Sequence, residues 1–210
     1  MKSYARIIAQ LALQSSAASL LLVTSAAHAQ NSSGGQLVKA LRRGGHVIVM
    51  RHASSPRDAP DQQSADADNV NRERQLDEAG QASAIAMGNA LRKLKIPIGE
   101  VFTSPTYRAR ETVRLLQLPA PQAIAELGDG GKSMQGVTEA QSAWLRKKVS
   151  QLPTATNTLI VTHAPNMTRA FPQWTSGLAD GEALIFGSDG KGGATLLGRI
   201  KIEEWPRIRL

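Results

Sequence analysis

The chain has 210 residues, a formal net charge of +8 at pH 7 and no cysteine. Its length suits one domain with one hydrophobic core and leaves little room for a second domain. Without cysteine there are no disulfides, no thiolate metal ligands and no cysteine nucleophile. The positive net charge favours anionic partners such as small phosphates, nucleic acid or acidic membrane surfaces, but it does not indicate which of these the protein binds.

The first 29 residues are typical of a cleavable signal peptide. Lys2 and Arg6 give a basic start, "AASLLLV" forms a short apolar centre, and "AHA" before the glutamine at position 30 matches an A-x-A cleavage site. We therefore expect cleavage after Ala29, a mature domain over residues 30–210, and a periplasmic or secreted location. The apolar centre is too short for a persuasive membrane span, so no stable span is expected after cleavage.

Helices and strands alternate along the rest of the chain. In chain order, the sequence predicts a helix at 36–43, a strand at 46–50, a long loop at 54–75, a helix at 78–94, a strand at 101–104, a helix reaching residue 116, a weak strand at 123–127, a helix from 138 to 152, a strand at 158–162, and an edge hairpin of strands at 183–186 and 194–202. This alternation favours an α/β sandwich with a largely parallel sheet.

Three of the predicted helices carry starting signals. Asp77 can cap the helix at 78–94, and Thr138 with Gln141 forms a capping-box pattern. Ser104 followed by Pro105 predicts a cap and then a proline at the first helical position.

Polar side chains follow three of the predicted strands. Arg51 and His52 follow the first strand, Ser104 the second, and His163 the strand at 158–162. Ligands of open α/β sheets bind outside the carboxyl ends of parallel strands. If these strands are parallel neighbours, their polar side chains share one rim of the sheet.

The side chains at this rim suit a phosphate. Arg108 lies in the first turn of a predicted helix, where a cation opposes the helix dipole unless an anion binds there. Guanidiniums match phosphate oxygens, and two histidines can flank the phosphorus, one attacking and one stabilising charge. For attack, His52 needs an unprotonated ring nitrogen, which requires an acceptor at its other nitrogen.

The motifs resemble those of the histidine phosphatase superfamily, the phosphoglycerate-mutase-like fold. That family has R-H-G, then S-x-x-x-R-A-x-x-T, then a strand ending in a second histidine. This chain has "RHA", "SPTYRARET" and "VTHAPN" in that order, and "QLDEAG" resembles the family's L-T-x-x-G helix start. The resemblance covers most of residues 47–166 and implies a three-layer α/β/α sandwich with a mostly parallel central sheet.

The resemblance also implies roles for these residues. His52 is the nucleophile that becomes phosphorylated, and Arg51, Arg108 and His163 form the rest of the phosphate pocket. Hydrolysis would proceed through a phosphohistidine intermediate attacked by water, with no metal and no organic cofactor. This describes a metal-independent phosphatase of the histidine acid type acting on a small phosphorylated substrate.

Two positions depart from the family pattern. Ala53 and Ala164 follow the two histidines, where the family usually has glycine. Alanine fits both places if neither needs a positive φ.

The family places a carboxylate between the second arginine and the second histidine as general acid. Glu126 is the predicted acid because it ends the weak strand at the same rim, and Asp129 is the alternative. Further candidates lie in the loop after His52, namely Asp61, Asp66 and Asp68. A second acidic group of the substrate could bind one of the arginines that flank the site in sequence, namely Arg57, Arg72 and Arg74.

The leading prediction is an exported phosphatase acting on phosphomonoesters or a related phosphoryl compound. A mutase must protect its phosphoryl group from water and needs phosphorylated sugar acids, so export favours hydrolysis. A catalytically weak or inactive phosphate-binding module stays open because of the two alanines and the unassigned acid. Specific nucleic-acid binding is not expected, since aromatic residues are 4% of the chain and no nucleic-acid motif is present. The sequence does not indicate the substrate or the oligomeric state.

Overall fold

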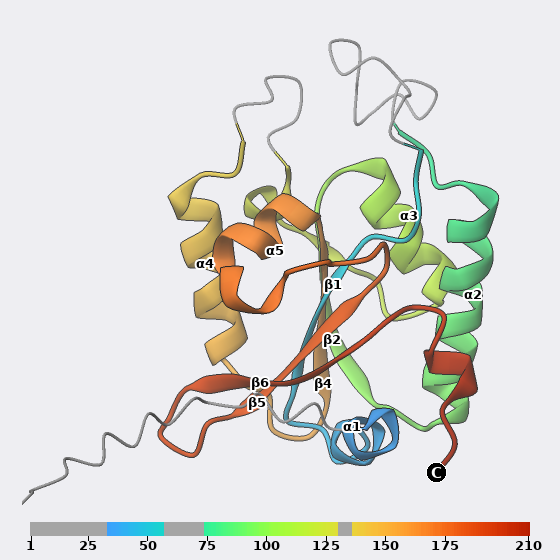
Figure 1. Ribbon diagram of the computed structural model, residues 1–210, viewed down its shortest axis with the longest axis vertical. Helices are drawn as coiled ribbons and strands as arrows, with labels where there is room; N and C mark the ends of the chain where they lie inside the picture. Colours follow the sequence, from blue (N-terminus) through green and yellow to red (C-terminus); the bar gives the residue numbers. More distant parts are fainter. Residues whose placement is uncertain (1–32, 57–73, 130–135) are drawn as a thin grey trace, which may run out of the picture.

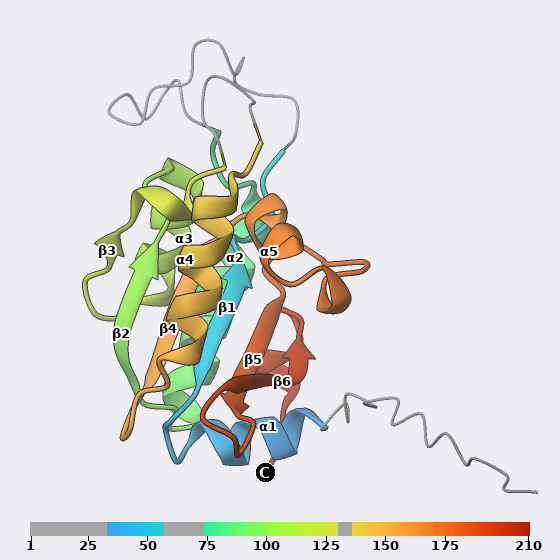
Figure 2. The ribbon, with the colours of Figure 1, turned by 90° about the vertical axis from the view of Figure 1, so that its left-hand side faces the viewer.

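One six-stranded sheet organises the protein (Figure 1), and its strands lie in the order β3-β2-β4-β1-β5-β6 (Figure 2). The computed structural model describes residues 33–56, 74–129 and 136–210. The strands are β1 (Val47–Arg51), β2 (Ile98–Thr103), β3 (Gln122–Ala123), β4 (Asn157–Thr162), β5 (Ala183–Ser188) and β6 (Ala194–Ile200). β1, β4, β2 and β3 pair in parallel, whereas β5 pairs antiparallel to both β1 and β6. The predicted mostly parallel sheet and its edge hairpin are confirmed.

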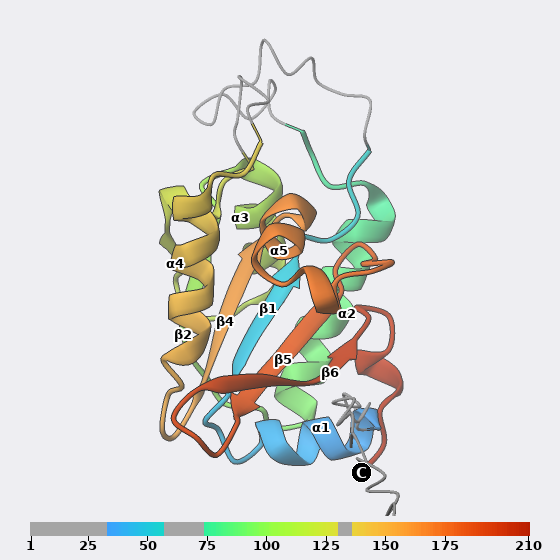
Figure 3. The same cartoon turned by 60° about the vertical axis from the view of Figure 1, so that its left-hand side comes forward.

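Helices cover both faces of the sheet. The helices are α1 (Gly34–Leu41), α2 (Glu78–Lys93), α3 (Tyr107–Leu116), α4 (Glu139–Ser150) and α5 (Ala164–Ala170). Residues of α1, α2 and α3 pack in one hydrophobic cluster, and residues of α4 and α5 pack in another. Figures 2 and 3 show α4 and α5 in front of the sheet and α2 behind it. The three-layer α/β/α sandwich is therefore confirmed.

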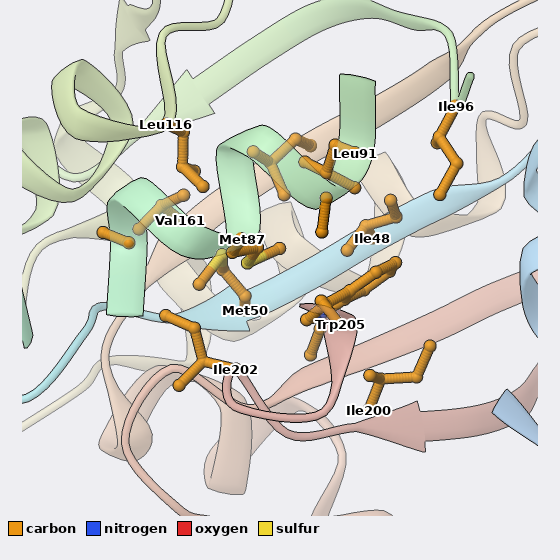
Figure 4. Close-up of a cluster of buried hydrophobic side chains, with 14 of the residues drawn as sticks. Ile48, Met50, Met87, Leu91, Ile96, Leu116, Val161, Ile200, Ile202 and Trp205 are labelled. Carbon is orange, nitrogen blue, oxygen red and sulfur yellow. The ribbon is translucent and has the colours of Figure 1, made fainter. Parts of the chain in front are cut away.

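The core divides between the two faces because successive side chains of a strand point in opposite directions. Ile48 and Met50 of β1 belong to the cluster that includes Met87 of α2 and Trp205 near the C-terminus (Figure 4). Val47 and Val49 belong to the cluster on the opposite face. β1 is thus buried on both sides, which makes its carboxyl end a rigid platform.

The helix-start predictions are confirmed at two of three places. Asp77 caps α2 by accepting the Gly80 N–H at 2.6 Å, and Thr138 forms the capping box with the third residue of α4. The prediction for α3 is wrong, because the helix begins at Tyr107 with Thr106 as N-cap. The Ser104 hydroxyl instead accepts the Thr106 N–H and contacts a histidine, so it shapes a turn before the helix.

Two other elements differ from the predictions. The weak strand at 123–127 is shorter and earlier: β3 has two residues and is followed by a 3₁₀ helix, η2 (Ala125–Leu127). The Leu127 N–H donates to the Ile124 carbonyl and the Leu127 carbonyl accepts the Thr162 hydroxyl, which closes a turn in place of a strand. α5 was not predicted and begins directly after His163.

Several predictions fall outside the described residues. These are the signal peptide, most of the loop at 54–75, and the side chains of Arg57, Asp61, Asp66, Asp68 and Arg72. Within the described ranges, no helix is long and apolar enough to cross a membrane.

Candidate active site

Three parallel strands bring the predicted polar residues to one rim of the sheet. His52 follows β1, His163 follows β4, and Ser104 follows β2, and these strands are neighbours. Arg108, in the first turn of α3, lies between the two histidines. Its Nε is 3.2 Å from His52 Nε2, and one of its terminal nitrogens is 3.1 Å from His163 Nδ1. The predicted meeting of these side chains is confirmed.

His52 has the hydrogen bonds that a nucleophilic imidazole needs. It is 2% exposed, and its Nδ1 lies 2.8 Å from the Ala53 carbonyl oxygen. Because a carbonyl can only accept, Nδ1 carries the proton and Nε2 keeps its lone pair. That lone pair accepts from Arg108 Nε, and a terminal nitrogen of Arg74 lies 3.4 Å away. Burial lowers the pKa of His52 well below 6.5, and the charges of His163 and Arg108 lower this pKa further.

Ala53, directly after His52, fits its position without strain. In the described part of the chain, the non-glycine residues with positive φ are Lys95 and Gln117, so neither Ala53 nor Ala164 adopts that conformation. The Ala53 N–H donates to Thr112 Oγ1 at 3.1 Å, which ties this residue to α3. The departure from glycine therefore leaves the backbone geometry around His52 intact.

His163 is held as a neutral imidazole. Its Nδ1 accepts from Arg108, and its Nε2 lies 2.8 Å from the Ser104 hydroxyl, to which it can donate. The ring is 1% exposed, and its centroid is 5.2 Å from that of His52. Burial lowers the pKa of His163 well below 6.5, with further lowering by Arg108, Arg74 and Arg51.

Three guanidiniums surround this pair of histidines. Besides Arg108, the site contains Arg74, whose Nε donates to Ser55 Oγ at 3.0 Å, and burial followed by the charge of Arg108 lowers the pKa of Arg74. Arg51 contacts Asp180 at 2.5 Å, while its buried Nε has no hydrogen-bond partner among the described residues. Because an unsatisfied buried donor costs about 1–3 kcal/mol, this cationic cluster favours an anionic ligand.

Asp129 is a carboxylate that contacts both Arg108 and His163. It pairs with Arg108 and lies 3.5 Å from His163 Nδ1. The side chain of Glu126, the first choice from the sequence, makes no hydrogen bond or ion pair with another described residue. Glu126 lies in a 3₁₀ helix and not at a strand end. The contacts thus favour the alternative carboxylate, and the role of Glu126 stays a prediction without contact support.

Side chains of β4, α4 and α5 hold the turn that precedes Asp129. The Asn166 amide donates to the Gly128 carbonyl at 2.8 Å, and the Gln141 amide donates to the same carbonyl at 2.7 Å. Thr162 Oγ1 donates to the Leu127 carbonyl at 2.7 Å. Asn166 ends the motif "VTHAPN", and its position three residues after His163 could have indicated a role at the same rim.

Comparisons with known proteins bear on the family and the fold. Residues 47–127 match the histidine phosphatase superfamily (branch 1). The fold is similar to the protein histidine phosphatase SixA complexed with tungstate, with a TM-score of 0.56, 21% identity, and coverage of 76% of this chain and 98% of that chain.

Two further structures show the same fold. Bacillus stearothermophilus YhfR matches with a TM-score of 0.53 and 16% identity over 72% of this chain and 94% of that one. SixA from Agrobacterium tumefaciens matches with a TM-score of 0.50 and 18% identity over 74% and 97%. None of the curated proteins matches the chain. The resemblance to the histidine phosphatase superfamily and its phosphoglycerate-mutase-like fold is confirmed.

Proposed function

We propose that this chain, with its histidine phosphatase superfamily match over residues 47–127, hydrolyses phosphomonoesters or a related phosphoryl compound. The observation that carries the proposal is the state of His52: its Nδ1 is bound to a carbonyl, and its unprotonated Nε2 lies beside the guanidiniums of Arg108 and Arg74. A buried, unprotonated imidazole among cations suits attack on an anionic phosphoryl group.

In the first step, His52 Nε2 attacks phosphorus and the bond from phosphorus to the leaving oxygen breaks. The guanidiniums of Arg51, Arg74 and Arg108 bind the phosphoryl oxygens, on which negative charge accumulates. Asp129 transfers a proton to the leaving oxygen. A substrate that binds as its monoanion can first supply that proton to the Asp129 carboxylate. His163 keeps Arg108 oriented through Nδ1.

In the second step, water attacks the phosphohistidine. The bond between Nε2 and phosphorus breaks, the Asp129 carboxylate takes a proton from the water, and inorganic phosphate leaves. The electron pair of the broken bond returns to His52 Nε2. The ring keeps the same tautomer because Nδ1 stays hydrogen-bonded to the Ala53 carbonyl throughout. Side chains supply the nucleophile, the phosphate ligands and the group that transfers protons in this cycle. The proposal therefore includes independence from metal ions and organic cofactors.

The test is phosphate release by residues 30–210 from a panel of phosphomonoesters and phosphoramidates. We expect His52→Ala to lower kcat/KM by at least about a thousandfold, as for other removed nucleophiles. His46→Gln is the matched control, because His46 lies at the opposite end of β1, and it should keep wild-type rates. If wild-type protein releases no phosphate in a His52-dependent manner, the chain is instead a phosphate-binding module.

We also propose that the chain is exported. The support is the signal-peptide pattern of residues 1–29, and the predicted product is a periplasmic or secreted protein that begins at Gln30. N-terminal sequencing of protein from cell fractions checks this. Protein that retains Met1 and stays in the cytoplasm would contradict export without affecting the proposed chemistry.

A further inference from the structure

An ion pair between a buried glutamate and a partly exposed arginine lies next to the first strand of the phosphate-binding rim. Glu182, which is 3% exposed, precedes β5, and Arg199 lies in β6. Arg199 Nε and Nη2 donate to the two carboxylate oxygens of Glu182 at 2.7 and 2.8 Å. This two-pronged geometry fixes direction as well as distance. Burial raises the pKa of Glu182, but hydrogen bonds from Arg199 and from a backbone N–H outweigh burial and lower it overall.

The pair also binds the backbone of residues 174–182, here called the anchor segment. Arg199 Nη1 donates to the carbonyls of Trp174 and Ser176 at 3.2 and 3.0 Å. The Glu182 carboxylate accepts the Ala179 N–H at 2.9 Å. After Trp174 the anchor segment contains turns but no helix or strand, so these bonds fix a backbone that no regular ladder supports.

The anchor segment in turn holds the first two residues of the proposed site. Its contacts are Asp180 with Arg51 Nη2 at 2.5 Å, the Leu178 carbonyl with Arg51 Nη1 at 3.4 Å, the Glu182 carbonyl with the Arg51 N–H at 3.1 Å, and the Gly181 N–H with the His52 carbonyl at 3.0 Å. The anchor segment therefore holds both the backbone and the guanidinium of Arg51.

We infer that Arg199 and Glu182 are positioning residues that aim the Arg51 guanidinium at the substrate phosphate through the anchor segment. This rests on the proposed function in that Arg51 is taken as a phosphate ligand. Neither member of the pair needs to touch substrate. Because the Glu182 carboxylate is buried, its desolvation cost offsets much of the attraction to Arg199, so the polar character of the pair is better explained by the backbone groups it fixes.

The test compares Arg199→Met with the double variant Arg199→Met/Glu182→Leu in the full chain. The single variant leaves a buried carboxylate unpaired and should be less stable, whereas the double variant restores an apolar contact and should recover most of the thermal midpoint. We expect the double variant to keep a raised KM and a kcat/KM about tenfold below wild type, which equals about 1.4 kcal/mol. A purely structural pair would lower the active fraction and leave KM unchanged.

Arg114→Met provides the matched control. Arg114 makes the same two-pronged pair, with Glu111 on the exposed side of α3, at 2.7 and 2.6 Å. Its loss should leave KM and kcat unchanged. Arg199→Lys keeps the charge but loses the fork, so its KM should lie between those of wild type and the double variant.

Affinity for inorganic phosphate, measured by calorimetry, separates this inference from the proposed function. We expect the double variant to bind phosphate about fivefold more weakly, which equals about 1 kcal/mol. Equal phosphate affinity and equal KM in wild type and double variant would overturn the positioning role even if the protein is a phosphatase. If the wild-type protein releases no phosphate and the double variant still binds phosphate more weakly than wild type, the proposed enzymatic function is wrong and the positioning role is supported.

Discussion

Asp129 is the residue whose assignment the contacts changed most. Between the second arginine and the second histidine, the sequence favoured Glu126 as general acid, with Asp129 as the alternative. Asp129 is the one of the two that pairs with Arg108 and lies 3.5 Å from His163, so it is the carboxylate that we propose as general acid. The turn that carries it is fixed by Asn166, Gln141 and Thr162, so this carboxylate has a defined position.

Asp129→Asn should slow substrates according to their leaving groups. With an alkyl phosphate, whose leaving oxygen needs protonation, we expect kcat to fall by about 10²–10⁴-fold. With a nitrophenyl phosphate, which leaves readily as an anion, the loss should be far smaller. Glu126→Gln is the control and should preserve both rates. A large alkyl-selective loss in Glu126→Gln would return the acid role to Glu126.

Among the elements, the start of α2 packs tightly against the backbone of the segment that follows His52. A Cβ at Gly80 would lie 2.1 Å from the Ser54 carbonyl oxygen, so only glycine allows α2 to pack against the segment after His52. Asp77 reinforces the contact, because its carboxylate accepts both the Gly80 N–H and the Ser54 hydroxyl. The "QLDEAG" motif thus joins a helix cap to the nucleophile's loop.

Gly80→Ala should therefore impair both folding stability and catalysis. We expect a loss of about 1–3 kcal/mol in the free energy of unfolding, as for other overpacked sites, together with a lower kcat as residues 53–55 shift. Chemical denaturation and phosphatase kinetics measure the two effects. Gly35→Ala, in the first turn of α1, meets its nearest atom at an ordinary 3.5 Å and should be neutral or slightly stabilising. Equal behaviour of the two variants would contradict the packing argument.

The elements also show what the sequence could predict. The sequence predicts four of the site residues because strands with a strong apolar pattern precede them and parallel strands end at a common rim. These residues are Arg51, His52 and His163, directly after a predicted strand, and Arg108, in the helix that follows one. Asp180 was missed because it reaches the rim before antiparallel β5, and no local pattern indicates that β5 pairs with β1. The 3₁₀ turn at 125–127 was read as strand because its apolar residues satisfy either conformation, and side-chain bonds from β4 and α5 decide between them.

Viewed as a whole, the molecule keeps its buried imidazoles neutral within a basic protein. Burial is the main cause that lowers the pKa of His52, His163 and His46, and nearby cations lower these values further. In the unfolded chain these groups titrate near 6.5. Below that pH the unfolded state binds protons that the folded state does not, so acid favours unfolding.

Stability and activity should consequently diverge as pH falls. From pH 8 to 7 these histidines should contribute little slope to the free energy of unfolding. As the pH falls through 6.5, each should lower it by at most about 1.4 kcal/mol per pH unit. Because burial holds the pKa of His52 well below 6.5, kcat/KM should fall at lower pH than it would for a histidine of ordinary pKa, as long as the protein is folded. Urea denaturation at several pH values measures the slope, which His163→Gln should reduce; an unchanged slope in that variant would contradict the assignment.

The long sequence separations within the site bear on when it can form. Arg108 and His52 are 56 positions apart, and Arg51 and the Leu178 carbonyl are 127 apart. Contacts of such range form slowly, because the chain between them must first be ordered. On the ribosome, β1 and its histidine are made early, but the backbone partners of Arg51 and His52 emerge only with the last quarter of the chain. Until β5 pairs with β1, Arg51 and His52 lack their contacts with residues 178–182. Phosphate affinity measured during refolding should therefore report completion of the sheet.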